Sequence, residues 1–421
     1  MPSLFTRPVA LVLTAVLALL LIVRGVVPAL SRIDTDFLNY LTAAKIVVDG
    51  GEVGRLYDDA WFQQQLLLYA PGQAIRGKFS PFPPPTALLL VPLSALSPLA
   101  ALRATTAISV LCVIVSIALL AKILAWPASD AAVIVLSSGY AIANGLRFGQ
   151  PYMLVSLSCV FGYYAWRRSW PLLSGLSLGV FAPIKYFPVI IVAGLGYLRQ
   201  WRVVAGAVIA VAGVALLSIG VLGFDIHRQY LVSVLGQHLT AHLSGQDPFS
   251  VSFQSWDSLY RRLFVWDAVL NPHPWRTQPA AAPIATALTK GALALLTLVA
   301  IGRLRRVHRD DIQAAAAPCI GLLGIATLLL APATASYHFV LLWLPVALLV
   351  DDFLRAQQRR AAFGVLGLYA LMGFFPYRFT LPFEGRGALG VLAYPRLALL
   401  LAMLLGSVVA IGSRREASGQ A

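Results

Sequence analysis

The apolar run PVALVLTAVLALLLIVRGVVPAL, residues 8–30, decides the class of this protein. A helix crosses a bilayer with about 20 apolar residues, so this run is long enough to span. It is too long for the core of a signal peptide and has no obvious small-residue cleavage site. We therefore expect an uncleaved first span, with Arg7 on the cytoplasmic side.

The composition of the whole chain agrees with this first run. Of 421 residues, 59% are hydrophobic and 12% are charged, and the mean hydropathy is +0.79. A soluble protein has about 25% charged residues, so the composition excludes a soluble enzyme, a disordered chain and a disulfide scaffold. Cys112, Cys159 and Cys319 each lie inside an apolar run and are predicted to be small buried residues.

Further apolar runs indicate how often the chain crosses the membrane. They lie near 99–123, 131–147, 151–166, 171–184, 186–198, 203–223, 284–302, 314–331, 337–350, 361–377 and 388–412. If 86–98 is a shallow or re-entrant piece, the count is about twelve and both termini are cytoplasmic. The runs on either side of 183–188 could instead be one kinked helix. We predict an all-α polytopic membrane protein, with residues 1–421 as a single integral membrane domain of about twelve transmembrane helices.

The net charge of +15 is mainly a signal of topology. Many of the basic residues fall in short breaks between apolar runs, which the positive-inside rule places in the cytoplasm. These residues are Arg7, Lys122, Arg167, Arg168, Arg199, Arg202, Arg303, Arg305, Arg306, Arg309, Arg355, Arg359, Arg360, Arg414 and Arg415. They form no single continuous basic surface, so we expect no nucleic-acid partner.

Two polar stretches are predicted to face the outside. The first polar stretch, 31–85, holds acidic and basic residues in nearly equal number and so lacks the basic surplus of the cytoplasmic breaks. Apolar residues at helical spacing predict amphipathic helices over 37–48 and 59–69, lying at the membrane surface. The proline-rich segment 79–85 then returns the chain to the bilayer as an extended connector. The second polar stretch runs over 224–283.

Three groups of polar residues are candidates for chemistry. Asp34 and Asp36 form a DxD pair, which in soluble glycosyltransferases holds a metal on a nucleotide sugar, but this chain has no room for a nucleotide-binding domain. On local pattern, Asp36 is also a candidate helix N-cap. Lys185 is a lone charge between apolar runs, a functional hypothesis by default, although a lysine snorkelling to the interface is the simpler alternative. His238 and His242 could share a helix face, but two histidines do not make a metal site.

A succession of short motifs makes the chain recognisable. These are DFLNYLTAA (36–44), LYD (56–58), FPPPTALLLVP (82–92), FGQ (148–150), GLSLG (175–179), IKYFP (184–188), SFQSWDSL (252–259) and ASYHF (335–339). In this order the chain resembles glycosyltransferase family 87. The resemblance implies a GT-C-like fold and inverting transfer of a sugar, typically mannose, from a polyprenyl-phosphate donor. It also implies an aspartate of the first outer loop as the base.

Residue roles follow from combining the resemblance with the chemistry. We predict Asp36 as the general base, with Asp34 as the second choice, because inversion needs one group to accept the proton of the acceptor hydroxyl. The leaving phosphate needs cations or hydrogen-bond donors. We assign that role to Lys185, His338, Arg261 and Arg147, and substrate binding to Tyr40, Gln150 and Tyr57. No metal and no cofactor are required.

The predicted protein is therefore a polyprenyl-phosphate-sugar-dependent mannosyltransferase. It would act on a lipid-linked or envelope glycan acceptor at the outer (periplasmic) face of a bacterial cytoplasmic membrane. One alternative is a transporter or lipid flippase, for which the sequence shows no convincing internal repeat. Another is a glycan polymerase or ligase, which shares the lipid-phosphate leaving group and differs in the donor.

Overall fold

The fold is built from helices alone. The computed structural model describes residues 4–33, 35–73, 75–239, 247–308 and 311–418, apart from the side chains of residue 35 and of 414–418. Throughout those ranges every regular element is helical, which confirms the predicted all-α class. Asp34 lies outside the described residues, and so does His242.

Seven helices in the described part of the chain are long and apolar enough to cross a membrane. They are Arg7–Ser31 (α1, Arg7–Leu21; η1, Ile22–Val26; α2, Val27–Ser31), α5 (Pro98–Leu124), α11 (Trp201–Leu222), α15 (Ala281–Val307), α16 (Ile312–Leu330), Ser336–Arg355 (η6, Ser336–Leu342; α17, Trp343–Arg355) and Pro395–Ser413 of α19 (Pro395–Ser418). An eighth is possible if α18 (Arg359–Phe374) counts together with Tyr377–Phe383, which bends from it by 82°. The predicted count of about twelve is not confirmed.

The difference lies in apolar runs that fold as short or broken helices. The run 131–147 divides into α6 (Ala128–Leu136) and α7 (Tyr140–Arg147), with Gly139 between them at φ +53°. α9 (Pro171–Phe181) and α10 (Pro188–Tyr197) have 11 and 10 residues. At 1.5 Å per residue, each is about half as long as the ~30 Å hydrocarbon core is thick. α8 (Tyr152–Arg167) is longer, with 16 residues. Run length in a sequence does not show where a helix breaks.

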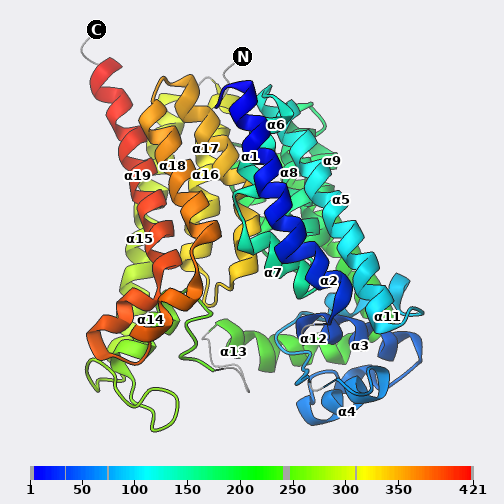
Figure 1. Cartoon of the computed structure of the whole chain (residues 1–421). Coiled ribbons are helices and arrows are strands. Elements are labelled where there is room, and N and C mark those ends of the chain that lie inside the picture. The colour runs from blue at the N-terminus through cyan, green and yellow to red at the C-terminus, as the bar shows by residue number, and fades with distance from the viewer. Residues whose placement is uncertain (1–3, 34, 74, 240–246, 309–310, 419–421) are drawn as a thin grey trace.

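The first polar stretch contains the two predicted amphipathic helices, α3 (Thr35–Val48) and α4 (Asp59–Tyr69). α3 is followed by Gly50 at φ +68°, a conformation that glycine adopts without steric cost at the end of a helix. The Asp58 carboxylate caps α4 by accepting a hydrogen bond from the Trp61 backbone N–H at 3.0 Å. Both helices lie at the end of the bundle opposite the two chain termini (Figure 1). The stretch 86–98 contributes only short 3-10 turns (η3, Pro84–Leu88; η4, Val91–Leu93) before α5 begins.

Hydrogen bonds link the segments at or near the breaks between apolar runs that carry the basic residues. The Arg355 guanidinium donates to the Leu124 carbonyl at 3.2 Å, which brings the C-termini of α17 and α5 together. The Trp166 indole donates to Gln200 at 3.0 Å, which places the break after α8 beside the break before α11. The Leu4 backbone N–H donates to Asp130 at 2.8 Å, near the start of α6. These breaks therefore lie at the end of the bundle that carries the termini (Figure 1).

Glycines let α9 and α11 approach closely. A Cβ on Gly175 would lie 2.0 Å from the Val203 carbonyl oxygen. The GLSLG segment is therefore a helix-packing motif, as its apolar context predicts, and not the nucleophile elbow that its spacing resembles. This packing supports the turn between α9 and α10, which carries Lys185.

Candidate active site

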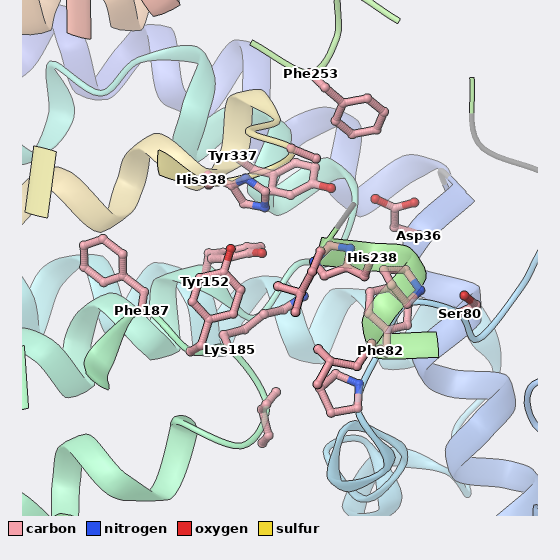
Figure 2. A pocket seen from close by; sticks show the side chains of 18 of the residues that line it. Asp36, Ser80, Phe82, Tyr152, Lys185, Phe187, His238, Phe253, Tyr337 and His338 are labelled. Atoms are coloured by element: carbon pink, nitrogen blue, oxygen red, sulfur yellow. The ribbon is translucent and has the colours of Figure 1, made fainter. Parts of the chain in front are cut away.

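A cavity of about 340 Å³ lies between the first polar stretch and the helix bundle. Several elements meet around it: α3, the connector 78–83, the N-terminus of α8, the α9–α10 turn, η6 and the second polar stretch. Its polar and titratable lining residues are Asp36, Asn39, Lys78, Ser80, Tyr152, Lys185, Tyr186, Tyr230, His238, Thr327, Tyr337 and His338. Figure 2 shows Asp36, Lys185, His238 and His338 around the same space. The cavity thus combines one carboxylate with several basic groups.

Two buried side chains, Gln150 and Tyr40, form a hydrogen-bonded relay that holds the Asp36 carboxylate in place. Gln150 donates from Nε2 to Asp36 Oδ2 at 2.7 Å, and the Tyr40 hydroxyl donates to Gln150 Oε1 at 2.8 Å. Tyr40 and Gln150 are 0% and 1% exposed. Burial raises the pKa of the Tyr40 phenol well above its usual value, so the phenol stays protonated and remains a donor. Tyr337 also donates a hydrogen bond to Asp36. The relay fixes the orientation of the carboxylate.

This geometry refines two interpretations drawn from the sequence. Asp36 lies inside the first turn of α3, not at its N-cap. Tyr40 and Gln150, predicted to bind substrate, do not line the cavity and instead contact each other and Asp36. From this position they can act on the substrate indirectly, by orienting the Asp36 carboxylate.

Lys185 lies between two aromatic rings at the edge of the cavity. Its Nζ atom is 4.9 Å from the ring centre of Phe82 and 4.9 Å from that of Tyr152. Contacts of this kind stabilise a cation electrostatically when it lies within about 6 Å of the ring. The charge of Asp36 also acts on Lys185. Lys185 is therefore held facing the cavity (Figure 2), which disfavours the snorkelling alternative.

His338 belongs to an aromatic cluster on the other side of the cavity. Its Nδ1 accepts a hydrogen bond from the Ala335 backbone N–H at 3.0 Å, so the proton of a neutral ring lies on Nε2. The ring packs edge-on against Tyr152 and Tyr337, with ring centres 4.7 and 4.9 Å apart. An imidazole fixed in this way offers a hydrogen-bond donor in a defined direction.

Comparison with known proteins identifies the family. A sequence model of glycosyltransferase family 87 matches residues 81–332, more than half of the chain. The chain belongs to glycosyltransferase family 87. It is therefore a glycosyltransferase, and its long apolar helices make it a membrane protein. Membership disfavours the transporter and flippase alternatives. No curated protein and no solved structure matches the chain.

Not every predicted residue of this glycosyltransferase reaches the cavity. Arg147, at the C-terminus of α7, does not line it, and its guanidinium lies 5.8 Å from the Phe148 ring. Arg261, on α14 (Trp256–Phe264), does not line it either. Tyr57 contributes indirectly, because its hydroxyl donates to the Phe82 carbonyl at 2.7 Å and so holds the connector in place. The sequence predicts both arginines as hydrogen-bond donors to the phosphate, but their positions in the chain do not specify how close they lie to the cavity.

Other lining residues of this glycosyltransferase were not predicted. Lys78 and Asn39 line the polar side, and the Asn39 side-chain oxygen accepts from the Lys78 backbone N–H at 3.1 Å. Burial lowers the pKa of Lys78, and the charge of Asp59 opposes that effect. Tyr337 directly precedes His338 in the ASYHF motif, so its place in the sequence could have predicted it as a lining residue. Among the described residues no group of three or more His, Cys, Asp or Glu side chains could hold a metal ion.

Replacing Gln150 by Leu tests the relay in this family 87 enzyme. We expect kcat to fall about ten-fold or more at an unchanged KM for the donor, because a misplaced base slows the chemistry without removing a substrate contact. Tyr40→Phe should have a smaller effect in the same direction, since Gln150 keeps its bond to Asp36. The measurement is a steady-state assay per amount of folded enzyme. A change confined to KM would mean that Gln150 binds substrate directly.

The turn before Gln150 provides a second test. Gly149 has φ +57°, and a Cβ there would lie 2.4 Å from Cδ2 of Phe37. Gly149→Ala should therefore destabilise the contact between this turn and α3 by about 1–3 kcal/mol. Thermal unfolding of the purified protein measures the loss. Gly364→Ala in α18 is the matched control, because a Cβ at that position meets no atom within 4 Å. Equal unfolding temperatures for the two variants would contradict the prediction.

Proposed function

We propose that this glycosyltransferase moves a sugar, typically mannose, from a polyprenyl-phosphate donor to a lipid-linked or envelope glycan acceptor, with inversion at the anomeric carbon. One observation carries the proposal: the Asp36 carboxylate and the Lys185 ammonium line the same cavity. An inverting transfer of this kind needs a base for the acceptor and a cation for the leaving phosphate.

Asp36 supplies the base in this proposal. The acceptor hydroxyl oxygen attacks the anomeric carbon and Asp36 takes its proton, while the bond from that carbon to the phosphate oxygen breaks on the opposite face. Asp36 accepts a hydrogen bond from Gln150 through Oδ2. The relay behind the carboxylate supports the assignment, because a fixed base costs little reorganisation in the transition state.

Lys185 and His338 stabilise the departing phosphate. Negative charge grows on the phosphate as the glycosidic bond breaks, and donors already fixed in place stabilise that charge without reorganising. The aromatic rings around Lys185 and the packed ring of His338 provide such fixed positions. A membrane-bound lipid phosphate needs no nucleotide site, and the reaction as proposed needs no metal.

The apolar part of the cavity supports a lipid donor. The apolar lining residues include Phe187, Leu235, Leu328 and Leu341, together with Ile184, Leu239 and Ala331. An apolar wall beside a charged pocket suits an amphipathic substrate, with the head group at the polar groups and the chain against the wall.

The distribution of charge supports an outer-facing site. The basic breaks and both termini lie at one end of the bundle, while α3 and α4 lie at the other (Figure 1). By the positive-inside rule the first of these ends is cytoplasmic. The polar side of the cavity, next to α3, then opens on the periplasmic side of a bacterial cytoplasmic membrane.

A donor screen with purified enzyme in lipid tests the proposal. Transfer is measured from polyprenyl-phosphate mannose and from the corresponding glucose and arabinose donors, and the anomeric configuration of the product is read by NMR. Transfer from one of these donors with inversion supports the proposal. Use of polyprenyl-diphosphate-linked glycans alone would instead indicate the polymerase or ligase alternative. Retention of configuration would exclude Asp36 as a simple general base.

A further inference from the structure

His238 reaches the cavity from the second polar stretch. It lies on α13 (Leu235–Leu239) and lines the cavity with Lys185 and His338. Figure 2 shows the helix of His238 next to the cavity, with its ring among the labelled side chains that surround the space. The charge of Lys185 acts on His238, and His238 in turn acts on His338. The three basic side chains therefore come from separate elements and form one cluster.

One ring nitrogen of His238 has no partner. Its Nδ1 atom is buried and makes no hydrogen bond with any described residue. Buried polar atoms in proteins are almost always hydrogen-bonded, so an unpartnered nitrogen on a residue that lines a cavity indicates a polar ligand. A polar group of the substrate would satisfy this atom.

Contacts of residues 226–230 hold the segment that leads into α13. Tyr230, in η5 (Tyr230–Val234), stacks on Tyr57 with ring centres 6.1 Å apart. His227, in α12 (Phe224–Gln229), bonds through its ring to the Gly223 carbonyl at 2.8 Å and to the Ser218 hydroxyl at 3.0 Å. Ile226 packs in a core cluster with residues of the first polar stretch. His238 is thus presented by an anchored segment.

We propose that His238 is a further phosphate-contacting residue of the donor site and donates a hydrogen bond to the lipid phosphate beside Lys185 and His338. This inference rests on the proposed function, because it concerns the donor of that reaction. A neutral imidazole carries one N–H donor, and an imidazolium carries two, so either form can make the contact. No proton transfer from His238 is required.

The electrostatics of the cavity agree with this role. Burial lowers the pKa of His238, and the positive charge of Lys185 lowers it further. An anion beside these groups has the opposite effect, because it favours the protonated form of each of them. A phosphate monoanion or dianion therefore interacts favourably with Lys185 and with the N–H donors of both histidines.

The test compares two ligands that differ only in the phosphate. Decaprenyl phosphate and decaprenol are titrated into the purified full chain, and binding is read from the unfolding temperature. The unmodified protein should bind the phosphate more tightly. In His238→Ala the affinity for decaprenyl phosphate should fall about ten-fold or more, with no change for decaprenol, as for loss of a hydrogen bond to a charged group. His238→Asn, which keeps an N–H near Nδ1, should recover part of the loss.

His273→Ala is the matched control, because His273 is exposed and does not line the cavity. An equal preference for the phosphate in His238→Ala and the unmodified protein would overturn the inference and leave the proposed function standing. Failure of the unmodified protein to bind decaprenyl phosphate would count against the proposed donor, and the inference would fall with it.

A second measurement needs no variant. Diethyl pyrocarbonate modifies accessible neutral histidines, and mass spectrometry gives the rate at each position. Decaprenyl phosphate should slow the modification of His238 relative to decaprenol, while His273 reacts equally fast with either ligand. Equal rates at His238 with the two ligands would also overturn the inference.

Discussion

Replacing Asp36 by Asn is expected to abolish sugar transfer while the protein still folds and inserts. Asn has nearly the same shape, and its carbonyl oxygen can still accept the hydrogen bond from Gln150, which is 2.7 Å from Oδ2 in the native protein. It cannot accept the proton of the acceptor hydroxyl. Loss of a general base typically costs 10²–10⁴-fold in rate. The measurement is transfer of labelled sugar from polyprenyl-phosphate mannose in membranes.

Asp49→Asn is the matched control for this variant. Asp49 follows the C-terminus of α3, is exposed, and accepts a hydrogen bond from the Tyr69 hydroxyl at 2.7 Å without lining the cavity. It should keep the native rate. Transfer by Asp36→Asn within a few-fold of the native rate would remove Asp36 from the mechanism and return it to a structural role in the first turn of α3.

The second large effect is expected for Lys185→Met. Met has a similar length and packs well against aromatic rings, so it should remain between Phe82 and Tyr152. It removes the positive charge beside the leaving phosphate. We expect kcat/KM for the donor to fall about 10²–10³-fold, the range measured when one donor to a developing oxyanion is lost. Steady-state kinetics with varied donor concentration give the value.

Lys122→Met controls for the loss of a lysine as such. Lys122 lies near the C-terminus of α5, is exposed, and does not line the cavity. It should leave donor kinetics unchanged. Unchanged donor kinetics in Lys185→Met as well would favour the alternative in which Lys185 only anchors the α9–α10 turn at the membrane interface.

Structural features that depend on residues close together in the chain could be predicted from the sequence. α3 and α4 have apolar residues at helical spacing, a glycine after α3 and an aspartate cap before α4, and all of these signals are local. The close packing at GLSLG followed in the same way from small residues in an apolar helix. Lys185 could be predicted as a functional residue, because a lone charge between apolar runs costs free energy and commonly marks a functional site.

The number of spans could not be predicted from run length. Hydropathy reports the composition of a segment, whereas breaks such as Gly139 and the α9–α10 turn depend on how the neighbouring helices pack. For this reason the sequence predicts two spans, or one kinked helix, where the structure has the two short helices α9 and α10. Their packing places Lys185 at the cavity.

The sequence by itself determined that this is a polytopic helical membrane protein of glycosyltransferase family 87, because composition and motif order are properties of the chain alone. Only the tertiary structure decided which polar residues share the cavity. Gln150 reaches Asp36 across 114 residues of chain, and His238 reaches Lys185 from another polar stretch. Arg147 and Arg261 do not line that space. Contacts between distant segments arise from helix packing, and no local pattern encodes them.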